Sequence, residues 1–259
     1  MLNDQGILAA ACQSIEFLIP FWYKALRAHC NLPIAFVDLG MSLEAKAFCR
    51  DRGILIDFCH PAPDAGGRDA VDPSLADRWE KTHGSGVWHM RKKWFCKPFI
   101  FSLSPFQKTL WLDLDCEVRG DITSALSLCD DSCPIALTPE IEGYQKLFQQ
   151  HGFSSALQTI YNSGVVPFIT KSSIIEQWIQ ESTSASHKYI SDQDALSALI
   201  HKENIPLHIL PYEMNWDRTQ GHNDDALIIH WHSQKGKEIL KKQIHFLESL
   251  GWLETMYGS

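Results

Sequence analysis

Short apolar runs alternate with stretches of helical spacing along the first part of the chain. The runs from Ile7 to Cys12, Ile34 to Asp38 and Ile54 to Phe58 have the length and composition of buried strands. Between them, Pro20 is suited to open a helix that continues to His29, and Ser42 to cap a helix that ends at Gly53. Strands and helices in alternation predict a parallel sheet.

This pattern breaks between His60 and Gly86. The segment has prolines at positions 61, 63 and 73, two adjacent glycines and many charges, so we expect a long surface loop. Helical spacing resumes from Val87 to Leu103, with Pro98 as a kink or break. Apolar residues at helical intervals from Lys237 to Leu250 predict an amphipathic helix that packs on its own domain.

Composition narrows the class of protein. The chain has 259 residues, of which 45% are apolar, enough for the core of one large α/β domain. No run approaches the ~20 apolar residues of a membrane span, and Asn3 and Asp4 stand where a signal peptide carries basic residues. The eight cysteines are scattered without a CxxC pair, and the net charge is −8. We therefore expect a cytoplasmic protein with free thiols, no transmembrane segment and no nucleic-acid partner.

The segment from Lys108 to Val118, KTLWLDLDCEV, is an apolar run that ends in Asp113 and Asp115. Alternation along a strand places residues i and i+2 on one face, so both carboxylates can converge on a hard cation that also neutralises a diphosphate. Leu112 and Leu114 would then face the core. Alone, such a triplet is a weak pattern, because strand-ending aspartates often only cap a turn or helix.

Two polar clusters follow downstream. In Tyr161–Phe168 a small polar turn precedes an apolar strand, and Asn162 can offer its amide to sugar hydroxyls; an ordinary turn explains the pattern equally. In Ser191–Leu196 polar groups open a helix. N-capping and favourable charge at the helix N-terminus are the simpler interpretation of that cluster.

A third cluster lies near the C-terminus. A strand ends in His230, Trp231 and His232, and a loop with Lys235 and Lys237 leads into the last helix. Alternation places both histidines on one face, so either can complete a metal site while a lysine meets phosphate. A surface strand end with solvated lysines fits the same residues.

Other catalytic motifs are missing from the sequence. The first strand ends in AAACQS, without GxGxxG or GxxxxGK, which removes the main support for a dinucleotide or P-loop site. There is also no GxSxG motif, so a hydrolase is disfavoured.

The order of these clusters resembles that of the GT-A glycosyltransferases, and is most similar to family eight, which includes glycogenin and bacterial galactosyl- and glucosyltransferases. The resemblance covers roughly Phe95 to Lys237 by motif, and the first strands are consistent with the family's nucleotide-binding strands. It implies a single α/β GT-A domain over residues 1–259, with a Rossmann-like mixed sheet flanked by helices. Residues 1–118 would be the nucleotide-binding half, ending in Asp-x-Asp, and 119–259 the acceptor and sugar half.

The resemblance also assigns roles to residues. The metal ligands would be Asp113, Asp115 and His230, with His232 as a rival. Catalysis would fall to Asp192, binding sugar hydroxyls, and Gln193, near the anomeric carbon. Contacts to the sugar nucleotide would come from Ala10, Ala11, Lys97, Asn162, Ser163, Gly164, Asp194 and either Lys235 or Lys237.

Several positions depart from the family pattern. Ser233 stands where the family has glycine, and lysines lie five and seven residues after His230 where the family has one at six. The first strand lacks the acidic residue that commonly follows it in the family. The basic group before the aspartates is either the family's basic element or a solvated helix face; its members are Arg91, Lys92, Lys93 and Lys97.

The implied activity is transfer of a hexose from a UDP-sugar, with Mn²⁺ or Mg²⁺, to a glycan, lipid or protein acceptor. The resemblance implies retention, and front-face attack is favoured because Gln193 is too poor a nucleophile for double displacement. Two alternatives stay open. One is a catalytically inactive sugar-nucleotide-binding protein of the same fold; the other is a metal-dependent nucleotidyltransferase or phosphohydrolase, which normally needs more carboxylates.

Overall fold

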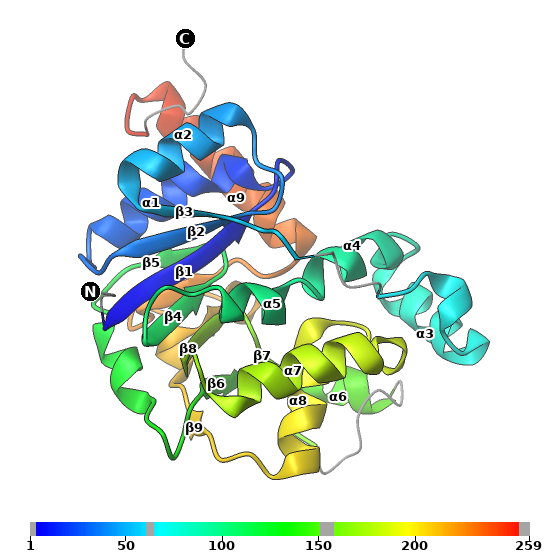
Figure 1. Ribbon diagram of the computed structural model, residues 1–259. Helices are drawn as coiled ribbons and strands as arrows, with labels where there is room; N and C mark the ends of the chain where they lie inside the picture. Colours follow the sequence, from blue (N-terminus) through cyan, green and yellow to red (C-terminus); the bar gives the residue numbers. More distant parts are fainter. Residues whose placement is uncertain (1–3, 61–64, 151–157, 254–259) are drawn as a thin grey trace.

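A five-stranded sheet forms the centre of the molecule. The computed structural model describes residues 4–60, 65–150 and 158–253. The sheet order is β3-β2-β1-β4-β8 (Figure 1). The first four strands are parallel, as predicted, and β8 runs antiparallel to β4. Their bounds are Gln5–Ala11 for β1, Ile34–Asp38 for β2, Ile54–Asp57 for β3, Lys108–Leu112 for β4 and Val165–Ile169 for β8.

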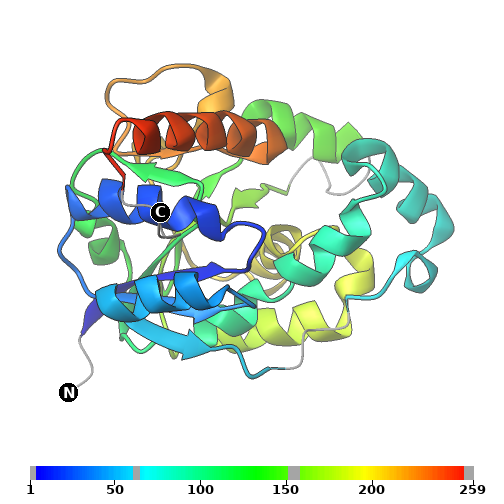
Figure 2. The same cartoon turned by 90° about the horizontal axis from the view of Figure 1, so that it is seen from above.

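Helices cover both faces of this sheet. One face carries α1 (Ile19–Arg27), α2 (Leu43–Arg52) and α9 (Ser233–Ser249), which lie together in the view from above (Figure 2). The other carries α5 (Lys97–Ser102), α7 (Ser173–Ser184) and α8 (Asp192–Glu203). This arrangement confirms the α/β fold expected from the sequence.

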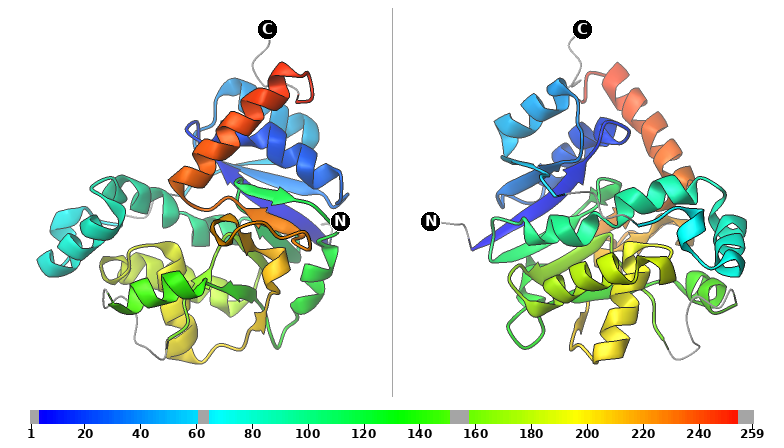
Figure 3. Two further views of the ribbon diagram at one scale, coloured as in Figure 1. Left: turned by 180° about the vertical axis from the view of Figure 1, so that it is seen from behind. Right: turned by 45° about the vertical axis from the view of Figure 1, so that its right-hand side comes forward.

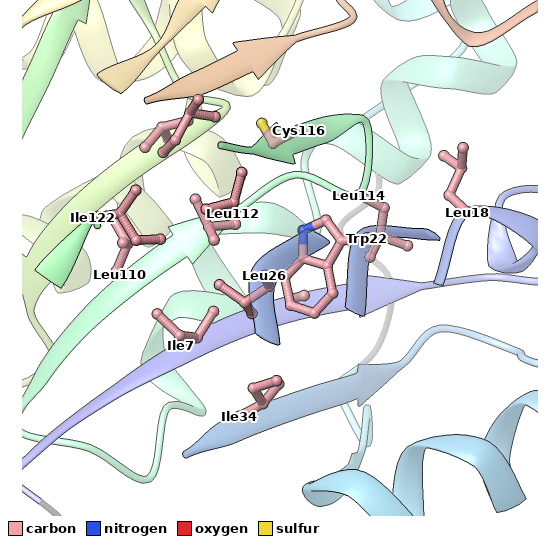
Figure 4. Packing of buried hydrophobic residues seen from close by; sticks show 14 of the residues in the cluster. Ile7, Leu18, Trp22, Leu26, Ile34, Leu110, Leu112, Leu114, Cys116 and Ile122 are labelled. Carbon is pink, nitrogen blue, oxygen red and sulfur yellow. The ribbon is translucent and has the colours of Figure 1, made fainter. Parts of the chain in front are cut away.

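Strand β1 shows why both faces are apolar. Ile7 and Ala9 belong to the core under α1 and α9, whereas Leu8 and Ala10 belong to the core on the opposite face. Successive side chains of a strand point to opposite faces, so a strand covered on both sides reads as a continuous apolar run. Figure 4 shows Ile7 in the first core together with Leu26 and Trp22 of α1.

The prediction of a loop from His60 to Gly86 is partly wrong in the described residues, and positions 61–64 of that range lie outside them. Helix α3 spans Pro73–His83. The Asp72 carboxylate accepts hydrogen bonds from the backbone of Ser74 and Leu75, and Trp79 is buried. Pro73 therefore opens a helix at its first position instead of breaking one.

Two shorter helices follow α3 in the chain and lead to the central sheet. Helix α4 (Val87–Trp94) ends before Phe95, and α5 begins at Lys97 with Pro98 in its first turn, which confirms the expected break. Helices α3 and α4 form an arm that stands out at one side of the molecule (Figures 1 and 2).

Small sheets complete the second half of the chain. Strand β11 (Ile228–His230) lies between β5 (Cys116–Val118) and β10 (Trp216–Asp217). Strand β6 (Ala136–Pro139) lies between β7 (Tyr161–Asn162) and β9 (His208–Ile209), and α6 is Glu142–Gln150. Short 3₁₀ turns occupy Glu16–Leu18, Arg68–Ala70, Thr123–Leu128, Ser186–Lys188, Tyr212–Met214 and Arg218–Gln220.

The C-terminal helix begins earlier than the sequence suggests, at Ser233 instead of Lys237. Leu240 and Ile244 are buried on the domain, whereas Phe246 and Leu250 are exposed; the helix lies along the back of the molecule in Figure 3. All eight cysteines are free, as expected. Among the described residues, no helix has the length and apolar character needed to cross a membrane.

Candidate functional site

The two aspartates lie in a turn, not on a strand. Strand β4 ends at Leu112, and β5 begins at Cys116, whose N–H donates to the Asp113 carbonyl at 3.0 Å. Leu112 and Leu114 are buried, as expected. The turn gives the two carboxylates different partners, so strand alternation was the wrong reason for grouping them.

Asp115 faces the C-terminal half of the chain. Its Oδ2 lies 2.5 Å from Lys237 Nζ, and its Oδ1 lies 3.5 Å from His230 Nε2. Burial alone would raise the pKa of the Asp115 carboxyl, but Lys237 and His230 together hold it below its ordinary value. The same contacts raise the pKa of His230 and of Lys237, against the effect of their burial.

A chain of hydrogen bonds fixes the tautomer of His230. The backbone N–H of Gly164 donates to Asn162 Oδ1 at 2.8 Å, which orients that amide. Asn215 Nδ2 donates to the same oxygen at 3.0 Å, so Asn215 Oδ1 is the acceptor that faces His230 Nδ1 at 3.0 Å. The Nδ1 atom therefore carries the proton, and in the neutral ring the Nε2 lone pair points toward Asp115. This arrangement suits a histidine that binds a metal.

Asp113 faces the opposite side of the turn. Its carboxylate accepts a hydrogen bond from Trp111 Nε1 at 2.8 Å and lies 3.1 Å from Lys97 Nζ. Lys97 also donates to the carbonyl and hydroxyl oxygens of Ser163, both at 3.1 Å. Burial would lower the pKa of Lys97, but Asp113 and Asp192 raise it above its ordinary value. Lys97 is thus a largely enclosed cation between Asp113, Ser163 and Asp192.

Asp192 and Gln193 open α8 beside this lysine. Asp192 Oδ2 lies 3.8 Å from Lys97 Nζ and accepts a hydrogen bond from the Ser163 hydroxyl at 3.0 Å. Burial raises the pKa of Asp192 although Lys97 opposes the shift. The Gln193 side chain accepts from the Ser163 N–H at 3.4 Å and donates to Glu140 Oε1 at 3.0 Å. Gln193 and Asp192 therefore flank Ser163.

Glu140 and Asn215 are site residues that the sequence interpretation missed. The buried Glu140 carboxylate accepts from Asn162 Nδ2 at 2.8 Å as well as from Gln193. Glu140 follows strand β6 directly, just as Asp113 follows β4. An acidic residue at the end of an apolar run was the available signal. Asn215 offered none, since its partners are distant in the sequence.

Gly164 allows His230 to approach the turn. A Cβ atom at position 164 would lie 2.2 Å from Cε1 and 2.8 Å from Nδ1 of the His230 ring. No side chain fits in that space. Gly164 thus packs against His230 and also lines the cavity beside the aspartates; the contact to the sugar that the family resemblance assigns to it remains a prediction.

The remaining candidates divide into two groups. Ala10 and Lys237 line the cavity beside the aspartates, whereas Ala11 and Asp194 are not among the residues that line it, and Lys235 is exposed. The Asp194 carboxylate accepts from the backbone and hydroxyl of Ser191 in a capping box at the start of α8. We therefore leave Asp194 out of the proposed donor site.

The four basic residues before the aspartates also fall into two sets, those that line the cavity and one that does not. Lys92, Lys93 and Lys97 line the cavity, but Arg91 is fully buried and donates to the backbone carbonyls of Ala65, Ser186, Tyr189 and Ile190. Arg91 therefore holds segments together and does not face the cavity.

Many of these polar groups line one large cavity of about 1310 Å³. Its lining includes Asp113, Asp115, Asp192 and Gln193. His232 also lines it, with its ring stacked between those of His230 and Tyr144 at centroid distances of 5.3 Å. Burial and the neighbouring His230 lower the pKa of His232. The cavity is large enough for a sugar nucleotide.

The fold is similar to that of solved glycosyltransferases. Galactosyltransferase LgtC, in complex with donor and acceptor sugar analogues, matches with a TM-score of 0.67 and 16% identity over 96% of each chain. An active-site mutant of LgtC, in which glutamate replaces glutamine, gives 0.61 and 17% over the same share of each chain. Mouse xyloside xylosyltransferase 1 gives 0.55 and 16%, over 88% of this chain and 97% of that one.

Sequence comparison adds no closer relative, because neither a protein-family model nor a curated protein matches. At these identities the structural likeness establishes the fold, a single mixed α/β domain of the GT-A type. Assignment to family eight remains a prediction.

Proposed function

We propose that this protein is a metal-dependent glycosyltransferase that moves a hexose from a UDP-sugar to an acceptor. The observation that carries the proposal is the meeting of two kinds of polar group in one cavity. Asp115, His230 and Lys237 suit a cation and a diphosphate, whereas Asp192 and Gln193 suit sugar hydroxyls. The glycosyltransferase fold supports this assignment.

The residues at the turn fit a divalent cation. Asp115 offers a carboxylate oxygen and His230 a ring nitrogen, and the two atoms face each other. Mn²⁺ and Mg²⁺ both bind carboxylate oxygens. The third proposed ligand, Asp113, must leave Lys97 to join Asp115 and His230. Cys116 lies in the same group of atoms, but its sulfur is a soft ligand, whereas Mn²⁺ and Mg²⁺ prefer oxygen, and burial raises the pKa of its thiol far above the ordinary value. A bound ion would stabilise the charge of the departing diphosphate.

Lys237 is the proposed phosphate ligand. It is the cationic partner of Asp115 in the structure, and an ion on Asp115 would leave its ammonium group available to a phosphate oxygen. Lys235 is exposed, so it is the weaker of the two candidates left open by the sequence.

Asp192 and Gln193 are the proposed catalytic residues. Asp192 would accept hydrogen bonds from sugar hydroxyls, and Lys97 would hold its carboxylate in place. Gln193 would lie near the anomeric carbon, and the active-site glutamine named for LgtC supports a glutamine in this part of the fold. Because an amide is a poor nucleophile, we propose retention by front-face attack, in which the leaving phosphate takes the acceptor's proton.

The nucleotidyltransferase and phosphohydrolase alternatives are less favoured, since a two-metal site normally needs more carboxylates than Asp113 and Asp115. A catalytically inactive protein of the same fold would bind UDP without turning over any UDP-sugar.

The test uses a panel of UDP-sugars with Mn²⁺, with release of UDP as the readout. Turnover of one donor is expected to fall roughly ten- to a hundredfold in Asp192→Ala and Gln193→Ala, because each loses a hydrogen bond to the sugar. UDP affinity should be nearly unchanged, and Gln220→Ala, at an exposed glutamine, should behave like the wild type. Melting temperatures identify any loss caused by unfolding. Full turnover by well-folded Asp192→Ala and Gln193→Ala proteins would reject the assignment.

A further inference from the structure

A second group of potential metal ligands lies beside the proposed donor site. One carboxylate oxygen each from Glu140 and Asp217 and a ring nitrogen of His232 lie within 4.8 Å of one another. Glu140 follows β6, Asp217 ends β10 and His232 follows β11. The ends of three strands thus bring together residues that are far apart in the sequence.

These groups have hydrogen-bonding capacity that the protein does not use. Asp217 is only 6% exposed. Its Oδ1 accepts from the backbone and hydroxyl of Thr219, but its Oδ2 is buried without a hydrogen-bond partner. The Nδ1 atom of His232 is also buried and unpartnered. Glu140 uses Oε1 for Asn162 and Gln193, which leaves Oε2 as the oxygen for a further ligand.

The charge of the group is also uncompensated. Glu140 is 3% exposed, and both carboxylates accept only from neutral amide and hydroxyl groups. In the described part of the chain, no lysine or arginine pairs with either of them. A buried carboxylate without a cationic partner is costly, and a metal ion is one of the few groups that compensate it.

We infer that Glu140, Asp217 and His232 form a second cation site, suited to Zn²⁺ or a similar divalent transition metal. Zinc accepts both carboxylate oxygens and imidazole nitrogens as ligands, and it keeps a further position open in sites with three protein ligands. Ligand atoms that bind one ion at ~2.1 Å lie ~3–4 Å from one another. The ligand atoms of Glu140, Asp217 and His232 therefore need to move only slightly closer together. His232 lines the cavity, so the ion would be accessible from it.

A cation here would act on residues of the donor site. Glu140 would hold the ion through one oxygen while the other holds Gln193 and Asn162. The site is separate from the Asp115 and His230 pair, so it can be tested whether or not the proposed glycosyltransferase activity is correct.

The experiment measures Zn²⁺ binding in equilibrium dialysis at low, buffered free Zn²⁺. All proteins carry Cys59→Ser, which removes the exposed thiol. In Asp115→Asn, where the first site is disabled, we expect one bound Zn²⁺ per chain. In Asp115→Asn/Asp217→Asn this ion should be lost, because the amide introduced at position 217 can still accept from Thr219 but offers no charged oxygen. The matched control adds Asp224→Asn, which alters an exposed aspartate paired with His222 at 2.7 Å; it should keep the ion.

Asp115→Asn/His232→Gln provides a second variant if the first does not fold, and it should also lose the ion. Absence of Zn²⁺ from folded Asp115→Asn protein, or its retention after removal of Asp217 or His232, would overturn the inference. Binding of glucosamine to the same residues without any Zn²⁺ binding would also overturn it, since the site would then take an ammonium group.

Discussion

Gly164 shows at the scale of one residue how the chain sets the position of His230. A Cβ atom at position 164 would clash with the His230 ring. The N–H of Gly164 begins the hydrogen-bond chain that runs through Asn162 and Asn215 to that ring. The sequence could not reveal this packing role of Gly164, because its partner His230 is distant in the sequence.

Gly164→Ala is therefore expected to displace His230. Overpacking of this kind costs about 1–3 kcal/mol of unfolding free energy, and Mn²⁺-dependent UDP binding should weaken as well. Urea denaturation and calorimetry measure the two effects. Gly143→Ala is the control, since a Cβ there meets nothing within 4 Å and alanine favours the helix. Equal stability and UDP affinity in Gly164→Ala and the wild type would contradict this packing argument.

Helix α8 shows at the scale of an element that one motif can serve structure and the site together. Asp192 and Gln193 line the cavity, whereas Asp194 closes the capping box with Ser191. Burial, supported by the nearby Asp192, raises the pKa of Asp194 from 3.8 to about 7. The unfolded chain therefore releases this proton at lower pH than the folded protein does.

The difference between the folded and unfolded pKa of Asp194 determines how its contribution to stability changes with pH. Because the folded pKa of Asp194 is the higher one, its contribution to stability is complete below about pH 4 and is lost as pH rises toward 7. Asp194→Asn keeps an oxygen for Ser191 but cannot ionise. Its stability relative to the wild type should therefore rise between pH 4 and pH 7, by a few kcal/mol at most. Urea melts across this range give the comparison, with the exposed Asp225→Asn as control. A difference between variant and wild type that stays constant with pH would show that Asp194 does not titrate in this way.

Much of the element pattern was predictable from the sequence, because buried strands and broken helices leave local signals. The strands from Gln5 to Asp57 and the break near Pro98 follow from apolar runs and proline chemistry. Helix α3 was missed because Pro73 was read as a breaker. The φ of Ser233 is +77°, a left-handed conformation that glycine adopts without strain; this explains a glycine at this position in the family pattern but not the serine of this chain.

At the scale of the whole molecule, segments are held together by contacts between residues that are far apart in the sequence. Arg91 was expected to belong either to the family's basic element or to a solvated helix face. It is buried instead, and its guanidinium lies 5.1 Å from the Phe95 ring centroid and 4.5 Å from that of Trp79. Its guanidinium joins the arm of α3 and α4 to the segment before α8. The candidate site residues were proposed from motifs, whereas Glu140 left only the weak signal of an acidic residue at the end of an apolar run. Asn215 left none, since only folding brings it to its partners.

Arg91→Lys should loosen the arm. An ammonium group cannot reproduce the planar set of hydrogen bonds, so buried carbonyls lose their donors and unfolding free energy should fall by about 2–4 kcal/mol. Amide hydrogen exchange should accelerate in α3 and α4. Arg78→Lys, at an exposed position of α3, is the control. Unchanged exchange in the arm of Arg91→Lys would mean that this arginine does not hold it.

The central claim is that Asp115 and His230 hold a cation through which the diphosphate binds. Its most direct test is the calorimetric affinity of UDP with Mn²⁺ and with EDTA, in the wild type, in Asp115→Asn and in the control Asp131→Asn, whose residue is exposed. We predict much tighter binding with Mn²⁺ in the wild type and the control, and loss of that difference in Asp115→Asn. Equal UDP affinity of the wild type with and without Mn²⁺ would contradict the account.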